Sequence, residues 1–250
     1  MHKVFIQLIV VPLVLFLAAC DKSELKKEGT VVWYEAFALP AMMEKSVEVK
    51  NQDDVKKLLT EKWYSAFEVT KSLSAKKADV KSSVNCQEYF SNPGMTTVSP
   101  PDYGPYLGIG LMCKAARIIS DAEPFKTTWL SDLQFDAQLP NKLPKQIAMV
   151  ISTSESERIA SDKSLVSWSD VEKIIKVEKK GPHKTNYHEV GGEQEMALMA
   201  RGDFNHDGLE DWLIASSYAV KGGTYRSLRM FVITKTAADG KILLLEEMSQ

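Results

Sequence analysis

Apolar positions in the first half of the chain recur with the spacing of an α-helix. From residue 55 onward they come every three or four positions, which places them on one helical face. These positions are Val55, Leu58, Leu59, Trp63, Ala66 and Phe67. Asn51 stands before them, where its side chain can cap the first turn. A second stripe predicts a helix over residues 111–122, and "NCQEYF" (residues 85–90) predicts a short one.

From about residue 195 the pattern changes to apolar-rich runs of strand length. The runs are "EMALMAR", "DWLIASSYAV", "SLRMFVITKT" and "KILLLEEM". An acidic loop and two glycine-containing turns connect them, and connections this short favour antiparallel hairpins. The sequence therefore predicts an α+β fold. We expect a helical part over about residues 50–140 and a β-meander over about residues 170–250, both within one domain of residues 30–250.

Shorter patterns lie between and before these parts. "TVVWYEAFAL" (residues 30–39) predicts a strand, "TTWLSDLQF" (residues 127–135) a short helix, and "QIAMVIS" (residues 146–152) a buried strand or short helix. Residues 91–110 hold four Pro and four Gly and predict a long loop. Its Tyr103 and Tyr106 are either a partner contact or part of an insertion that a disulfide pins at either side, and we prefer the second interpretation.

Composition indicates a globular protein and excludes little else. Of the 250 residues, 44% are hydrophobic and 26% are charged, which is far from the composition of disordered or multi-span membrane proteins. The net charge is −2. Because no basic stripe accompanies it, nothing in the charge pattern points to nucleic acid as a partner.

The first 19 residues have the order of a secretory signal peptide: a weakly basic start, an apolar run, then small residues. The stretch "LAAC" (residues 17–20) follows the apolar run and resembles the lipobox of bacterial lipoproteins. The resemblance implies that Cys20 is lipidated and becomes the first residue of a mature chain, that residues 20–29 are a tether, and that the protein faces the periplasm. Asp21 slightly favours the inner membrane over the outer one. An ordinary signal peptide with a chance cysteine is the alternative.

Cys86 and Cys113 are the other two cysteines. An oxidising compartment and an even count favour a disulfide between them. The bridge would close a loop of about 28 residues, for which chain entropy predicts roughly 3.5 kcal/mol of stabilisation. Two buried free thiols are the alternative, whereas a metal site lacks the expected neighbouring ligands.

The acidic loop "DFNHDGLED" carries the clearest chemistry. Asp203, Asn205 and Asp207 stand at positions 1, 3 and 5, and Asp211 stands at position 9. Alternate oxygen ligands followed by a glycine suit Ca²⁺, because the chain can then wrap round the ion. The backbone carbonyl of Leu209 would add a further oxygen. The alternative is a solvated acidic turn, in which the carboxylates would repel one another.

This loop and the apolar strand that follows it resemble the calcium loops of FG-GAP and VCBS-type repeats. The resemblance covers about residues 198–216 and occurs once, so it implies a calcium-bound hairpin connection and not a propeller. The chain also resembles uncharacterised proteobacterial lipoproteins with one such loop, which imply no function. Calcium sites of envelope and extracellular proteins often have a Kd of about 10⁻⁴–10⁻³ M, which suits a structural ion.

Motifs of catalysis are missing from the sequence: it has no nucleophile elbow and no phosphate-binding glycine loop. His183 and His188 form only a weak metal pattern. We therefore expect a non-enzymatic protein that is anchored to the bilayer through Cys20 and acts by protein binding, as an immunity or inhibitor protein against a periplasmic toxin or hydrolase. An envelope-assembly lipoprotein and a hydrolase with an unrecognised carboxylate pair are the alternatives.

Overall fold

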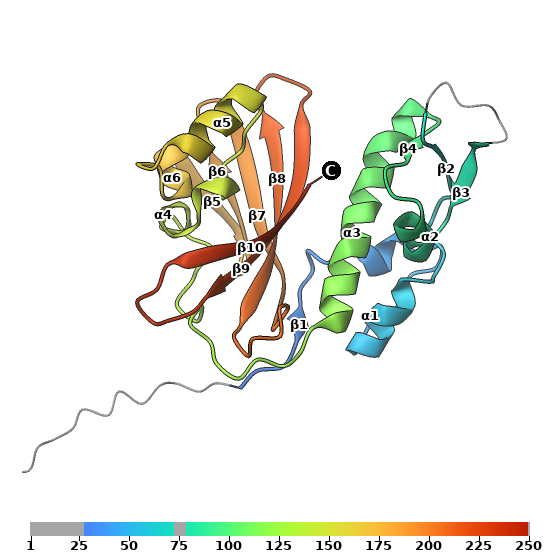
Figure 1. Cartoon of the computed structure of the whole chain (residues 1–250), viewed down its shortest axis with the longest axis horizontal. Coiled ribbons are helices and arrows are strands. Elements are labelled where there is room, and N and C mark those ends of the chain that lie inside the picture. Colours follow the sequence, from blue (N-terminus) through green and yellow to red (C-terminus); the bar gives the residue numbers. More distant parts are fainter. Residues whose placement is uncertain (1–27, 73–78, 250) are drawn as a thin grey trace, which may run out of the picture.

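A computed structural model describes residues 28–72 and 79–249 of the chain. It combines helices with antiparallel sheets, and its C-terminal part is an antiparallel meander, which confirms the mixed α+β class. Figure 1 shows the large sheet between two groups of helices, with α3 on one side and α4, α5 and α6 on the other. Among the described residues, none of the helices has both the length and the apolar character needed to span a bilayer.

The large sheet is ordered β10-β9-β8-β7-β6-β5, and each neighbouring pair is antiparallel. Its strands are β5 (Lys176–Gly181), β6 (Lys184–His188), β7 (Gly192–Gly202), β8 (Asp211–Val220), β9 (Arg226–Lys235) and β10 (Ile242–Ser249). The four predicted strands are β7 to β10. Strand β1 (Val32–Trp33) pairs with the end of β7, and it is all that forms of the strand expected over residues 30–39.

The central strands are apolar on both faces because both faces are covered. Leu213 belongs to a core shared with α3, whereas the next residue, Ile214, belongs to a second core on the opposite face. Trp168 and Phe135 come from the segment that covers this second face. Strands β5 and β6 have few apolar residues, and the sequence pattern did not reveal them.

The expectation of a helical N-terminal half is not confirmed. Helix α1 (Gln52–Leu58) is capped by Asn51 as predicted, but it ends nine residues before Phe67, which lies in β2 (Phe67–Thr70). Strand β2 pairs with β3 (Lys81–Ser83) and with β4 (Thr96–Thr97) in a second, small sheet. The apolar spacing correctly predicted burial of Trp63 and Phe67, but pairing with distant strands decided the backbone.

Helix α3 (Tyr103–Asp121) starts well before the predicted residue 111. It follows the short helix α2 (Cys86–Ser91), which the sequence predicted, and a 3-10 turn, η3 (Pro100–Asp102). A side chain at Gly110 would meet the ring of Tyr89 at 2.4 Å, so the glycine lets α2 and α3 approach each other closely. One of the glycines that predicted a loop, Gly110, therefore serves helix packing.

The remaining elements are short. A 3-10 turn, η1 (Leu39–Met42), precedes α1, and the second face of the sheet is covered by α4 (Leu139–Lys142), η4 (Lys145–Ile147), α5 (Thr153–Ser161) and α6 (Trp168–Val171). The short helix expected over residues 127–135 does not form, and only the first part of residues 146–152 is helical. These segments instead pack through single buried residues such as Leu130 and Ile147.

Candidate calcium site and binding surfaces

The acidic loop joins β7 to β8 at one end of the large sheet. The Asp203 carboxylate accepts hydrogen bonds from the N–H of Asp207 at 3.1 Å and of Gly208 at 2.7 Å. Asn205 Oδ1 accepts from the Asp207 N–H at 3.2 Å, and Asp207 Oδ1 accepts from the Leu209 N–H at 2.8 Å. These side chains therefore turn inward on the loop backbone, as they must in a loop that wraps round a cation.

Asp211 closes the loop from the first position of β8 and is fully buried. Its Oδ2 accepts a hydrogen bond from the Phe204 N–H at 2.9 Å, while its buried Oδ1 has no partner within the described residues. The pKa of Asp211 is raised to about 6, mainly by burial; the Thr234 hydroxyl and the Phe204 N–H lower it, whereas the carboxylates of Asp207 and Asp203 act in the same direction as burial. A buried carboxylate oxygen without a partner destabilises the folded protein unless it binds a cation or a proton.

Two residues of the loop have left-handed backbone conformations. His206 has φ of 63° and Gly208 has φ of 84°. Glycine adopts this conformation without steric conflict, which explains why the sharpest point of the turn carries Gly208. The ring of His206 turns toward Glu123, with 3.5 Å between Nδ1 and Oε1. The histidine side chain is thus directed at a neighbouring segment, away from the carboxylates of the loop.

Residues 123–127, which leave the end of α3, clasp the acidic loop through the backbone. Glu123 and Asp203 exchange two hydrogen bonds of 3.0 and 2.9 Å. The carbonyl oxygen of Gly208 accepts from the N–H of Lys126 at 2.9 Å and of Thr127 at 3.1 Å. The loop therefore connects the sheet to the segment that carries α3, and its conformation influences how these layers sit together.

Glu210 stands inside the loop sequence but points away from the candidate site. Its side chain is fully buried, forms an ion pair with Arg201 and accepts a hydrogen bond from the Thr128 hydroxyl. The guanidinium of Arg201 also lies 5.7 Å from the ring centre of Trp212. Glu210 is therefore a structural residue behind the loop, which agrees with its omission from the predicted ligand set.

The donors of the loop match Ca²⁺ in kind, since they are carboxylate, amide and carbonyl oxygens. The Leu209 carbonyl oxygen accepts no hydrogen bond from the described residues and is free to serve as a ligand. However, no group of three or more His, Cys, Asp or Glu residues has an arrangement that could hold a metal in the described part of the chain. Calcium at this loop therefore stays a prediction, supported by the unpartnered oxygen of Asp211.

Some of the other predicted site residues lie where the sequence predicted them, and others do not. Cys86 and Cys113 form the expected disulfide between α2 and α3. Tyr103 is 47% exposed, but Tyr106 is only 1% exposed and packs against Trp63. Tyr106 is therefore wrong as a partner contact, because the close approach of α2 and α3 turns it into the core. Cys20 and Asp21 lie outside the described residues.

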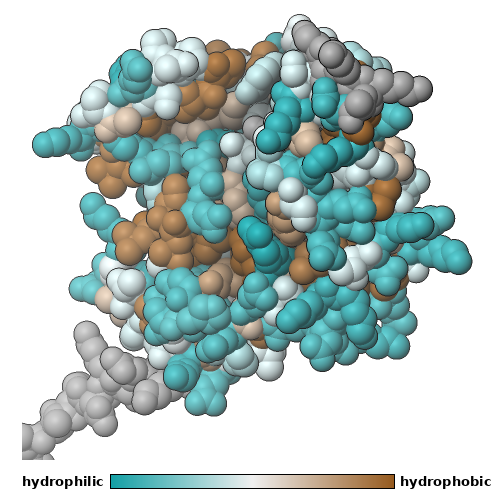
Figure 2. Space-filling view, turned by 45° about the vertical axis from the view of Figure 1, so that its right-hand side comes forward, coloured by the Kyte–Doolittle hydropathy of each residue, from teal (hydrophilic) through white to brown (hydrophobic). Residues whose placement is uncertain are grey.

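A hollow of about 520 Å³ lies between the large sheet and the layer of α3, and the sequence did not predict it. Its floor is apolar, with Met112, Ala197 and Leu228, and Tyr34 at its rim packs against the ring of His183 at 4.3 Å. Figure 2 shows one face of the molecule, where brown apolar surface lies among teal polar side chains. Such hollows form where distant elements meet, so no local sequence signal marks them.

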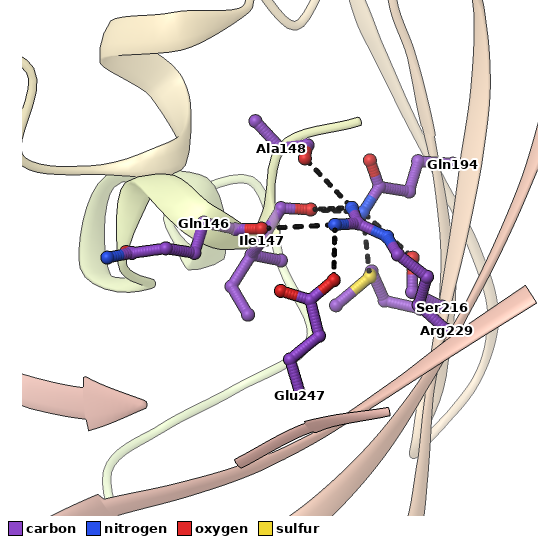
Figure 3. Close-up of polar contacts among 8 residues, drawn as sticks. Gln146, Ile147, Ala148, Gln194, Ser216, Arg229 and Glu247 are labelled. Carbon is purple, nitrogen blue, oxygen red and sulfur yellow. Dashed lines mark hydrogen bonds and ion pairs between the residues drawn. The ribbon is translucent and has the colours of Figure 1, made fainter. Parts of the chain in front are cut away.

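On the other face of the sheet, Arg229 is the centre of a polar network (Figure 3). It donates to the carbonyl oxygens of Ile147 and Ala148 at 2.8 Å each, and it pairs with Glu247 at 3.2 Å. Burial lowers the pKa of Arg229. Because these carbonyls belong to the segment after α4, the arginine fastens that segment to β9 and leaves few donors for a ligand.

Glu189 is a buried acid that the sequence did not single out. It is 4% exposed, and its Oε1 has no partner among the described residues. Its pKa is raised to about 7, mainly by burial and to a smaller extent by the charge of Glu172. Arg229 and the indole of Trp168 lower it, although the Trp168 N–H meets no oxygen at hydrogen-bonding geometry. Glu189 is therefore mainly protonated in the folded protein below about pH 7.

This acid makes the stability of the protein depend on pH. The folded-state pKa is about 7, above the ordinary value of 4.5. The protonated side chain therefore contributes its full stabilisation below about pH 4.5, and this stabilisation is lost as the pH rises through about 7. Glu189→Gln should remove this loss and make the variant more stable than wild type at pH 8, by at most about 3 kcal/mol. Urea unfolding at pH 5 and pH 8 measures the difference. The assignment is wrong if the difference in unfolding free energy between variant and wild type is the same at pH 5 and pH 8. It is also wrong if the exposed-site control Glu61→Gln gains as much stability at pH 8 as Glu189→Gln does.

Comparison of the chain with protein-family models, with curated proteins and with solved structures finds no match. The functional argument therefore rests on the residues and on their geometry.

Proposed function

We propose that the chain is a lipid-anchored protein of the bacterial envelope that faces the periplasm and acts by binding another protein. In this proposal Ca²⁺ is a structural ion of the acidic loop, and the partner is a toxin or hydrolase that the protein neutralises. The observation that carries the proposal is the position of exposed apolar residues relative to the point where the chain enters the fold.

The chain enters the fold beside the acidic loop. Gly29 exchanges backbone hydrogen bonds with Phe125 at 3.0 and 3.1 Å, and Val32 pairs with Arg201 at the end of β7. An acylated Cys20 joined by a short tether would therefore hold this end of the sheet toward the membrane. The opposite ends of the 11-residue β7 are about 30 Å apart. The far end would consequently project into the periplasm.

The far end of the sheet carries exposed apolar side chains. Val190, in the turn between β6 and β7, is 71% exposed, and Tyr225, before β9, is 44% exposed. Ile151 is 56% exposed and lines a hollow of about 610 Å³ together with Tyr225. Tyrosine and exposed apolar residues at one site are typical of protein interfaces. This membrane-distal end is the surface that we assign to the partner.

The anchoring step is tested by Cys20→Ser. Because the thiol carries the acyl chains in a lipobox, the variant should lose all labelling by a radioactive or alkyne-tagged fatty acid and should accumulate as uncleaved precursor. Electrophoresis of labelled cells measures both effects. The matched control is Cys86→Ser, which should be labelled and cleaved like the wild type. Normal labelling of Cys20→Ser would refute the lipobox.

The binding role is tested by competition between cells. Cells that lack the gene should be outcompeted by their otherwise identical parent when the two grow in contact, since the parent would deliver a toxin against which they have no protection. The intact gene should restore survival. A gene with Val190→Asp and Tyr225→Ala should not restore it, although the variant protein melts like wild type. Equal survival of all strains would contradict the immunity role.

A further inference from the structure

Strand β10 is the last strand of the large sheet, and its outer side is open. In the described part of the chain, its backbone pairs only with β9, and no other backbone hydrogen bond reaches residues 242–249. The register shifts between Leu244 and Glu246, so Leu245 also has no partner on β9. Proteins normally cover or charge an edge strand, since its free N–H and C=O groups can pair with another strand.

The same strand exposes leucines. Leu243 is 45% exposed and Leu245 is 41% exposed. Beside the start of β10, Trp129 and Val166 line a hollow of about 420 Å³ that also includes Leu243. Val166 is 49% exposed. An open edge with exposed leucines is a site for strand pairing, and leaving it uncovered favours association.

The charges on β10 indicate which strand would pair with its open edge. Lys241 stands just before the strand and Glu246 stands past its middle, with the leucines between them. Neither residue forms an ion pair with any residue that the structure describes, whereas the adjacent Glu247 is held by Arg229. When such a strand meets a copy of itself in antiparallel orientation, the positive end of each copy approaches the negative end of the other. The strand is therefore complementary to itself.

We propose that two copies of this chain associate through β10, antiparallel about a twofold axis near Leu244, and form one continuous sheet. Lys241 of each copy then faces the region of Glu246 in the other copy, and the exposed leucines of both strands are covered. A twofold axis requires that one patch be complementary to itself, which β10 satisfies. The twofold axis turns one copy end for end, so the strands of the dimer lie along the membrane surface and both tethers can reach it. This arrangement replaces the upright orientation considered above, and it does not depend on calcium binding.

Disulfide trapping in membranes tests the dimer with the full chain. Leu243→Cys should give a reducible band of twice the monomer mass after mild oxidation, because the strands meet close to the twofold axis. Val190→Cys, which is more exposed but lies in a turn away from β10, is the matched control and should stay monomeric. Trapping of both variants to the same extent would indicate random collisions and would overturn the proposal.

Charge exchange tests the orientation. In the Leu243→Cys background, Lys241→Glu and Glu246→Lys should each reduce the dimer band at least fivefold, since each change places like charges against each other. The two changes together should restore it. Lys114 and Arg117 line the same hollow as Glu246, so the melting temperature of each variant must be compared with that of its parent. Single variants that fold and still trap fully, or a Leu243→Cys adduct with a mass other than that of two chains, would refute the self-paired strand.

Discussion

Millimolar Ca²⁺ is expected to raise the melting temperature of the protein, and a chelator is expected to lower it. A ligand that binds only the folded state adds about 2.7 kcal/mol at a hundredfold excess over Kd. For a protein of this size that corresponds to a rise of about 5–10 °C. Mg²⁺ should have a smaller effect because it requires octahedral geometry and gives up its waters reluctantly. Differential scanning fluorimetry measures these shifts.

Asp207→Ala separates a metal site from an ordinary acidic turn. The change removes a central ligand and should erase the response to Ca²⁺. It also removes a charge from a crowded loop and lessens the repulsion on the buried Asp211, so without calcium the variant should be at least as stable as wild type. Asp239→Ala, in the exposed turn before β10, is the matched control and should keep the full response. A wild-type melt that is the same with Ca²⁺ and with chelator, together with no heat of binding in calorimetry, would rule out the ion.

Loss of the disulfide is expected to have an effect of similar size and opposite sign. Cys86 and Cys113 are fully buried where α2 meets α3, and their bridge closes a loop with a sequence separation of 27. Chain entropy predicts that the double change to alanine lowers stability by roughly 3.5 kcal/mol. The melting temperature should fall by about 7–14 °C. Alanine is chosen because it places no polar atom in the buried site.

A reducing agent provides the control for this experiment. It should lower the melting temperature of the wild type toward that of the double variant and should not change the double variant. Mass spectrometry of the protein from cells should find Cys86 and Cys113 in one linked pair of peptides. Alkylation of both thiols without prior reduction would show that the bridge does not form in the cell.

The acidic loop and the disulfide stabilise different parts of the molecule. The bridge lies within the core shared by α1, α2 and α3, whereas the acidic loop lies at the junction of α3 with the large sheet. Breaking the bridge should therefore loosen the N-terminal layer first. Removing Ca²⁺ should instead loosen the clasp between residues 123–127 and the loop, which hydrogen exchange of the Lys126 and Thr127 amides can follow.

Local features of the chain were predicted well from sequence. Asn51 caps α1, and α2 and the four apolar-rich strands form where their patterns placed them, because capping and short-range periodicity depend on neighbouring residues. The spacing of Asp203, Asn205 and Asp207 likewise predicted inward-turned side chains, since a tight loop leaves them little choice. The even number of cysteines and the expected oxidising compartment were enough to predict the bridge between Cys86 and Cys113.

Other features depended on contacts between distant residues. Phe67 lies in a strand because β3 and β4 pair with it, and Tyr106 is buried because Gly110 lets α3 approach Tyr89. The open edge of β10 and the raised pKa of Glu189 also follow from how the layers pack. The sequence alone therefore determined the Asn51 cap, α2 and the four apolar-rich strands, and it supplied the candidate ligands and the predicted anchor motif. Only the tertiary structure decided which residues are buried together and which edges stay open, because those outcomes depend on the packing energy of the whole fold.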